Sequence, residues 1–137
     1  HHEIELLEFL QAGLAEIPGV TIHGTKSLEN RVPTLSVSVE NYDAADVGAF
    51  LDVDHDILTR TGLHCAPLLH EHYGTAPRGT VRFSSGPFNT KDQVLHAIGA
   101  MEKIQAQRPA GVSGPVGAEL DEKRPDRPWD WDMRDGC

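Results

Sequence analysis

The segment "GTVRFSSGPFNTKDQV", residues 79–94, contains a strand followed by the start of a helix. Its first six residues predict a short β-strand that the chain enters from Pro77 and Arg78. Thr90 and Gln93 stand three residues apart and predict a capping box, in which each side chain bonds the other residue's backbone N–H. A helix is therefore expected to start here and to bury Val94, Ile98, Met101 and Ile104.

Two further strands and a strand-to-loop segment lie upstream of this region. "TLSVSVE", residues 34–40, alternates apolar and polar side chains, which predicts a strand with one buried face. "VTIHG", residues 20–24, predicts another short strand. "HDILTRTG", residues 55–62, predicts a third that runs into a loop.

Helical patterns alternate with these strands. An apolar stripe predicts an N-terminal helix ended by Pro18-Gly19, formed by Leu6, Leu7, Leu10, Leu14 and Ile17 and widened by Phe9. A second helix is expected to follow its N-cap Asp43, with Val47, Phe50 and Leu51 as its apolar face. "APLLHEHYG", residues 66–74, predicts a short helix. The fold class is therefore α/β (α+β), a short sheet packed against helices.

The domain organisation follows from length and composition. The chain has 137 residues, enough for one modest core. After Gln107 the sequence becomes rich in Pro, Gly and charged residues, so residues 1–107 are expected to form the domain and 108–137 a tail. Trp129 and Trp131 could dock this tail onto a surface. Because the chain begins at His1 and not at Met, we expect a processed terminus or one part of a longer protein.

Charge and hydropathy exclude several classes of protein. The net charge of −9 argues against a nucleic-acid surface, which needs clustered Lys and Arg. No apolar run approaches the roughly 18 residues of a membrane span, and no signal peptide is recognised. Cys65 and Cys137 form no disulfide framework, so a cytoplasmic location is expected.

Metal binding is not expected. Four residues have suitable side chains for zinc but lack the usual ligand spacing: His64, Cys65, His70 and His72. Asp52, Asp54 and Asp56 alternate like the start of a calcium loop. The glycine and the final glutamate of such a loop are missing.

Cys65 and Arg82 are the candidate functional residues. Cys65 lies in "RTGLHCAPLLH", residues 60–70, where Gly62 and Pro67 predict a loop. Arg60 and a His64 imidazolium would favour a reactive thiolate, although a buried inert cysteine fits the same residues. Arg82 is either a surface residue with a packed stem or a bidentate clamp for a carboxylate.

Three segments resemble the C-terminal domain of the class V aminotransferase family, in particular the cysteine desulfurases. "RTGLHCAP" resembles the persulfide-cysteine loop, and "GTVRFSSGPFNTKDQV" resembles the substrate-arginine strand with the Asn-Thr that opens the last helix. "YDAADVGAFLDVDHDILTRTG" resembles the helix and strand that lead into the cysteine loop. The similarity runs from Leu6 to about Ile104. It implies the small C-terminal domain of a fold-type I pyridoxal phosphate enzyme, which follows a larger cofactor-binding domain in that family.

The resemblance implies a role for each candidate. Cys65 would take sulfur from L-cysteine as a persulfide while alanine is released, and Arg82 would hold the substrate carboxylate. Arg60 would support the substrate or the thiolate in the same cleft. His64 would line the loop, without an assigned proton transfer. Asn89 and Thr90 would cap the final helix.

The resemblance also implies what this chain lacks. The family's Schiff-base lysine belongs to a large domain, and none of Lys26, Lys91, Lys103 and Lys123 lies in a segment resembling its site. We therefore expect no pyridoxal phosphate bound covalently to this chain alone, which would be a fragment or a split subunit. Expected partners are the large cofactor-binding domain, a sulfur-acceptor protein and a second copy of the intact enzyme. A stand-alone persulfide carrier, a non-catalytic interaction module and a selenocysteine lyase domain remain alternatives.

Overall fold

The computed structural model describes residues 1–25 and 27–107. The predicted tail, with Trp129, Trp131 and Cys137, lies outside the described residues, so its docking stays a prediction. Within the described part, no helix is long and apolar enough to cross a membrane.

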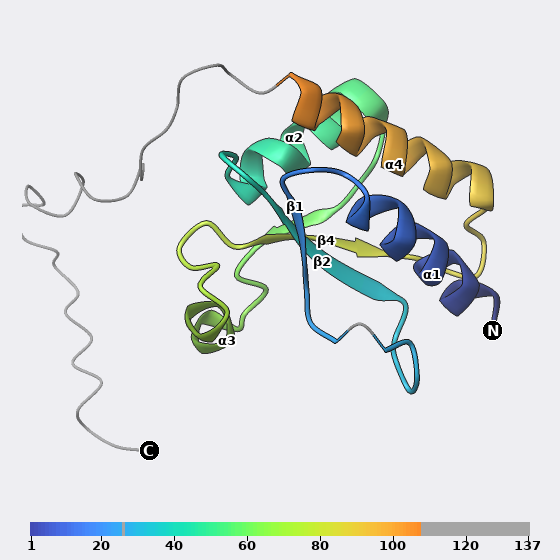
Figure 1. Cartoon of the computed structure of the whole chain (residues 1–137), viewed down its shortest axis with the longest axis horizontal. Helices are drawn as coiled ribbons and strands as arrows, with labels where there is room; N and C mark the ends of the chain where they lie inside the picture. The colour runs from blue at the N-terminus through green and yellow to red at the C-terminus, as the bar shows by residue number, and fades with distance from the viewer. Residues whose placement is uncertain (26, 108–137) are drawn as a thin grey trace, which may run out of the picture.

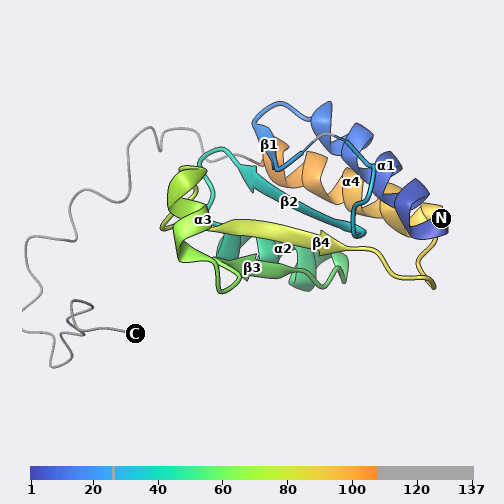
Figure 2. The same cartoon turned by 90° about the horizontal axis from the view of Figure 1, so that it is seen from below.

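Four helices and four strands interleave along the part of the chain that the structure describes. Their order is α1 (His2–Ala15), β1 (Val20–His23), β2 (Thr34–Val39), α2 (Ala44–His55), β3 (Arg60–Gly62), α3 (Pro67–His72), β4 (Thr80–Ser84) and α4 (Lys91–Ala106). The strands form one antiparallel sheet in the order β1-β2-β4-β3 (Figures 1 and 2). This architecture confirms the predicted mixed α/β class with a short sheet packed against helices.

One face of the sheet is apolar and carries the core. Leu35, Val37 and Val39 of β2 are buried, as their alternation predicts. They join Val81 and Phe83 of β4 and the apolar sides of three helices in one cluster. Figure 1 shows these helices, α1, α2 and α4, gathered along one side of the sheet, with α3 standing apart from them. The other face of the sheet is therefore left with polar side chains.

The capping box of α4 is confirmed. The Thr90 hydroxyl accepts from the Gln93 N–H at 3.3 Å, and the Gln93 side-chain oxygen accepts from the Thr90 N–H at 3.1 Å. The side-chain oxygen of Asn89 accepts from the Gly86 N–H at 2.7 Å. These bonds fix the path from the end of β4 into α4.

Two helix boundaries match the prediction, and one local prediction needs correction. α1 ends at Ala15, shortly before Pro18-Gly19. Asp43 is the N-cap of α2, as predicted; it makes no side-chain capping hydrogen bond, and its carboxylate pairs with Arg78 at 3.3 Å. Phe50 is 38% exposed and meets the ring of Tyr42 edge-on, so it does not belong to the buried face of α2.

Gly79 is required where β4 meets β3. A Cβ atom at this position would lie 2.4 Å from the backbone carbon of Gly62, and its φ of +71° belongs to the left-handed region. Gly74 has a similar φ of +67° but open space around it.

These two glycines give a matched test. We expect Gly74→Ala to lower the free energy of unfolding by about 1–2 kcal/mol for its left-handed backbone. Gly79→Ala should lose roughly a further 1–3 kcal/mol, because the new methyl group overlaps the neighbouring strand. Urea unfolding of both variants measures the difference. Equal losses of stability would show that β3 and β4 accommodate the methyl group at position 79 without strain, which would contradict the prediction.

Candidate functional site

A row of polar side chains crosses the open face of the sheet. In the strand registers His23 lies opposite Ser36, Ser36 lies opposite Arg82, and Arg82 lies opposite Arg60. Residues directly opposite each other in antiparallel strands point to the same face. The sheet therefore brings the two predicted arginines together, from segments far apart in the sequence.

The two arginines have no anionic partner. Neither side chain makes a hydrogen bond or an ion pair within residues 1–25 and 27–107, and the buried Nε of Arg82 has no acceptor. Like charges directly opposite in a sheet destabilise it. An anion bound between the guanidinium groups would remove this repulsion and would satisfy Arg82.

A cavity of about 290 Å³ lies on the same face, between the sheet and α3. Arg82 and Ser36 line it from the sheet, and His64, His70 and Tyr73 line it from the loop and α3. The structure therefore places two of the four candidate residues, Arg82 and His64, in one cavity. Arg60 lies beside Arg82 on the sheet, and Cys65 directly follows His64.

Cys65 lies in a tight turn and is exposed. The Ala66 N–H donates to the Leu63 carbonyl at 2.8 Å, and the two central residues, His64 and Cys65, have φ values of 49° and 61°. Positive φ at both central positions defines a type I′ turn. The predicted loop is thus a specific turn, and the alternative of a buried cysteine does not hold.

The two ring nitrogens of His64 have different surroundings. Nε2 lies 3.1 Å from the Thr80 carbonyl oxygen, which can only accept, so Nε2 carries the proton and Nδ1 carries a lone pair. Nδ1 is buried and has no hydrogen-bond partner among the described residues.

His64 is neutral near pH 7, which corrects one prediction. Burial lowers its pKa, and electrostatic interaction with Arg82, His70 and Arg60 lowers it further, while the bond to Thr80 acts in the opposite direction. The imidazolium expected to favour a Cys65 thiolate is therefore not formed at neutral pH.

Two further histidines, His23 and His70, line the cavity and were not predicted as site residues from the sequence. His70 is buried, and its Nδ1 lies 2.7 Å from the Thr75 hydroxyl. His23 Nε2 lies 2.8 Å from the Ser38 hydroxyl, and burial lowers the His23 pKa, with a smaller contribution from His70. The alternation of "VTIHG" and "TLSVSVE" could have placed His23 on the polar face. Within the described ranges, no three His, Cys, Asp or Glu side chains are arranged to hold a metal ion.

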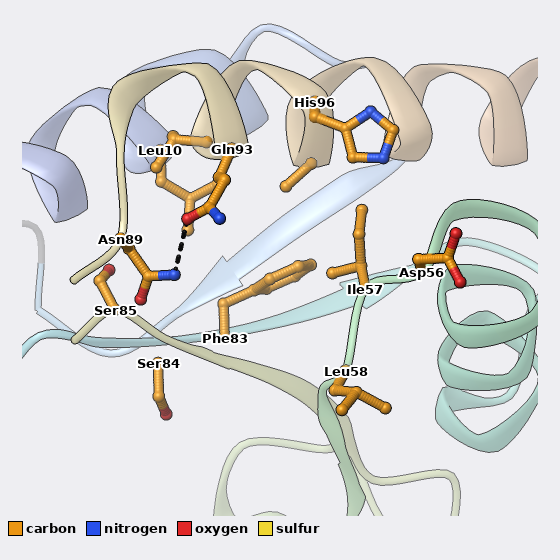
Figure 3. Close-up of a pocket in the computed structure, with 12 residues that line it drawn as sticks. Leu10, Asp56, Ile57, Leu58, Phe83, Ser84, Ser85, Asn89, Gln93 and His96 are labelled. Carbon is orange, nitrogen blue, oxygen red and sulfur yellow. Dashed lines mark hydrogen bonds between the residues drawn. The ribbon is translucent and has the colours of Figure 1, made fainter.

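A second cavity, of about 340 Å³, lies on the helix-covered side of the sheet. Figure 3 shows Phe83 at its centre, with Ile57 and Leu58 on one side and His96 of α4 above. Asn89 lies at its edge and donates to the Gln93 side chain at 2.9 Å, drawn as a dashed line. None of the four candidate residues lines this cavity.

Comparison with known proteins identifies a family. Residues 1–96 match the family described as aminotransferase class-V. A probable cysteine desulfurase 2 from Mycobacterium leprae is 42% identical over 93 residues, which cover 68% of this chain and 22% of that protein. A cysteine desulfurase from Salmonella agona is 31% identical over 103 residues, covering 75% of this chain and 24% of that protein.

Solved structures give the same result. The apo structure of a cysteine desulfurase from Thermococcus onnurineus superposes with a TM-score of 0.70 at 33% identity, covering 76% of this chain and 25% of that one. A cysteine desulfurase from Escherichia coli superposes with a TM-score of 0.63 at 25% identity, covering 74% and 24% of the two chains. The chain thus spans about a quarter of the length of these relatives.

The lowered pKa values of His23 and His64 predict a pH dependence of stability. Both folded-state values lie below the ordinary 6.5, so folding disfavours the protonated forms. Their contribution is complete above pH 6.5 and is lost as pH falls through the folded-state values. We expect the free energy of unfolding to decrease from about pH 7.5 to about pH 5, and to decrease less in a His23→Gln, His64→Gln double variant.

Urea unfolding at both pH values measures this effect. His72→Gln serves as the control, because His72 is exposed and does not line the cavity. The same pH dependence in the double variant and the wild type would contradict the assignment.

Proposed function

Because the chain belongs to the aminotransferase class-V family and is of the cysteine desulfurase type, we propose that it is the small C-terminal domain of a pyridoxal-phosphate-dependent cysteine desulfurase. In the intact enzyme this domain supplies the cysteine that receives sulfur from L-cysteine and the arginine that binds the substrate carboxylate. Alanine is the second product. The proposal covers an activity of the whole enzyme, of which this chain is one part.

One observation carries the proposal. Among the described residues, four buried side-chain polar atoms have no hydrogen-bond partner, and two of them, Arg82 Nε and His64 Nδ1, belong to residues lining the cavity beside Cys65. A buried polar group without a partner costs about 1–3 kcal/mol. One atom is a donor and the other an acceptor, which suits a small ligand with a carboxylate and a hydrogen-bond donor, such as an amino acid.

Arg82 is proposed to bind the substrate carboxylate. A guanidinium holds a planar carboxylate through two parallel N–H···O bonds, and Arg82 has no competing acid among the described residues. Arg60, directly opposite on β3, adds positive charge to the same face and supports the bound carboxylate.

Cys65 is proposed to act as the nucleophile. Its exposed turn leaves the sulfur open to a substrate held over the sheet face. As a thiolate, Cys65 attacks the substrate sulfur, and the new S–S bond forms as the substrate C–S bond breaks. The persulfide remains on Cys65 until a sulfur-acceptor protein takes the outer sulfur.

The described residues do not fit a covalently bound pyridoxal phosphate. Lys91 and Lys103 belong to α4, which packs on the opposite, apolar face, and Lys91 lies 4.4 Å from the centre of the Phe9 ring. Neither lysine of the described residues lines the cavity. We propose that a large domain or subunit supplies the lysine, the cofactor and the second wall of the site, in a cytoplasmic homodimeric enzyme.

A persulfide carrier is the second candidate. The exposed Cys65, and a cavity lined by no lysine of the described residues, would suit a protein that accepts sulfur from a donor without releasing it from L-cysteine itself. Persulfide on Cys65 after incubation with a sulfur donor, but without any cofactor-bearing partner, would favour the carrier. Persulfide formed from L-cysteine only with the cofactor-bearing part present would favour the enzyme.

The nucleophile is tested by mass spectrometry of the complete enzyme after one turnover with L-cysteine. We expect Cys65→Ser to abolish both the added sulfur atom and alanine release, while Cys137→Ser, at the other cysteine of the chain, retains both. Sulfur found on Cys137 and not on Cys65 would refute the assignment.

The carboxylate clamp is tested by kinetics of Arg82→Lys. A lysine keeps the charge but cannot hold the carboxylate with two parallel bonds. Because a charge-assisted contact is weakened, we expect the transition state to lose about 2–3 kcal/mol of binding free energy, which lowers kcat/KM for L-cysteine. Arg78→Lys is the control, because Arg78 pairs with Asp43 away from this cavity. Wild-type kinetics in Arg82→Lys would mean that Arg82 does not bind substrate.

A further inference from the structure

We infer that His64 is a positioning residue that holds Cys65 in its turn by anchoring the turn to strand β4. This role rests on the proposed function, since it concerns the presentation of the proposed nucleophile. It is separate from the substrate contact proposed for Nδ1 of the same ring, because it uses the opposite nitrogen.

The turn needs such an anchor. A type I′ turn places both central residues at positive φ, where asparagine and glycine are favoured and residues with larger side chains are strained. Here the central residues are His64 and Cys65, at 49° and 61°. The Ala66-to-Leu63 hydrogen bond of 2.8 Å closes the turn but is equally available to an Asn-Gly sequence. The strained pair therefore needs a further stabilising contact outside the turn.

The contact of His64 with Thr80 meets this need. Nε2 lies 3.1 Å from the Thr80 carbonyl oxygen and 3.2 Å from its hydroxyl. Thr80 is 2% exposed and pairs with Gly62 in the ladder between β3 and β4. The anchor point is therefore a buried strand residue that is itself fixed to the strand leading into the turn.

The anchor also orients the cysteine. His64 lines the cavity and its Nδ1 is buried, whereas the next residue, Cys65, is exposed. With the His64 ring fixed in the cavity, the turn leaves the adjacent Cys65 accessible at its edge. Loss of the anchor would let both residues leave the left-handed region and would change the direction of the sulfur.

The anchor is compatible with neutral pH. The bond to Thr80 needs only the proton on Nε2, which the neutral ring carries. A second proton on Nδ1 would be buried without an acceptor and would face the charges of Arg82 and Arg60. The neutral ring with its proton on Nε2 is therefore the form that holds the turn.

Hydrogen exchange of the Ala66 amide reports directly on the turn. His64→Asn tolerates positive φ and keeps a polar atom near Nδ1, but it cannot reach Thr80; His64→Gln keeps a donor near Nε2. We expect Ala66 to exchange about fivefold to tenfold faster in His64→Asn, and within about twofold of wild type in His64→Gln, as one ordinary hydrogen bond is lost or kept. Val81 in the core strand monitors the global fold.

Ser38→Ala is the matched control, because it removes another histidine–hydroxyl contact on the same sheet face, that of His23. It should leave Ala66 exchange unchanged. The inference is overturned if His64→Asn leaves Ala66 protected, or if Ser38→Ala exposes it equally. A wild-type His64 ring whose nitrogen chemical shifts place the proton on Nδ1 would also overturn it, and this measurement needs no variant.

Kinetics of the complete enzyme separate this inference from the proposed function. His64→Asn should lower kcat for L-cysteine about tenfold and leave KM within about twofold, because the nucleophile is misplaced while the carboxylate contact remains. An unchanged kcat would overturn the positioning role. If the wild-type enzyme releases no alanine, the proposed function fails, and Ala66 exchange still decides whether His64 holds the turn.

Discussion

The pairing of β3 with β4 is the contact on which the candidate site depends. Only three residue pairs join these strands, and they set Arg60 opposite Arg82 and Gly62 opposite Thr80. The close approach needs glycine at position 79, where a Cβ atom would overlap the Gly62 backbone. Because β3 leads directly into the Cys65 turn, one short ladder fixes the separation of the arginines and the starting point of the turn.

The two faces of the sheet have different roles in the domain. The apolar face, with Val37 and Val81 at its centre, packs against α1, α2 and α4 and provides the stability. The opposite face is polar, and the same alternation that buries Val37 and Val81 exposes Ser36 and Arg82 to the cavity. A substitution on the polar face can therefore alter chemistry without removing a core side chain.

Local signals made much of this fold predictable from sequence. The alternation of residues 34–40 and the capping box at Thr90 each depend on neighbouring residues, and both appear as predicted. The type I′ turn was not predicted, because its central positions hold neither glycine nor asparagine, and the contact of His64 is with Thr80, sixteen residues away. The prediction of a His64 imidazolium was wrong for a similar reason, because the burial and the nearby arginines that lower its pKa arise only in the folded structure.

The charge at the site is positive, whereas the net charge of the chain is negative. The protein carries 21 acidic and 12 basic residues, yet Arg60 and Arg82 face each other with no carboxylate bonded to either in the described part. An acid placed between them would relieve their repulsion and stabilise the free domain. It would also occupy the position proposed for the substrate carboxylate. In the absence of such an acid, an anion that binds between the two arginines can relieve their repulsion. The surrounding negative charge makes this pair a local positive feature, and it favours a small anionic group at the cavity over one elsewhere on the domain.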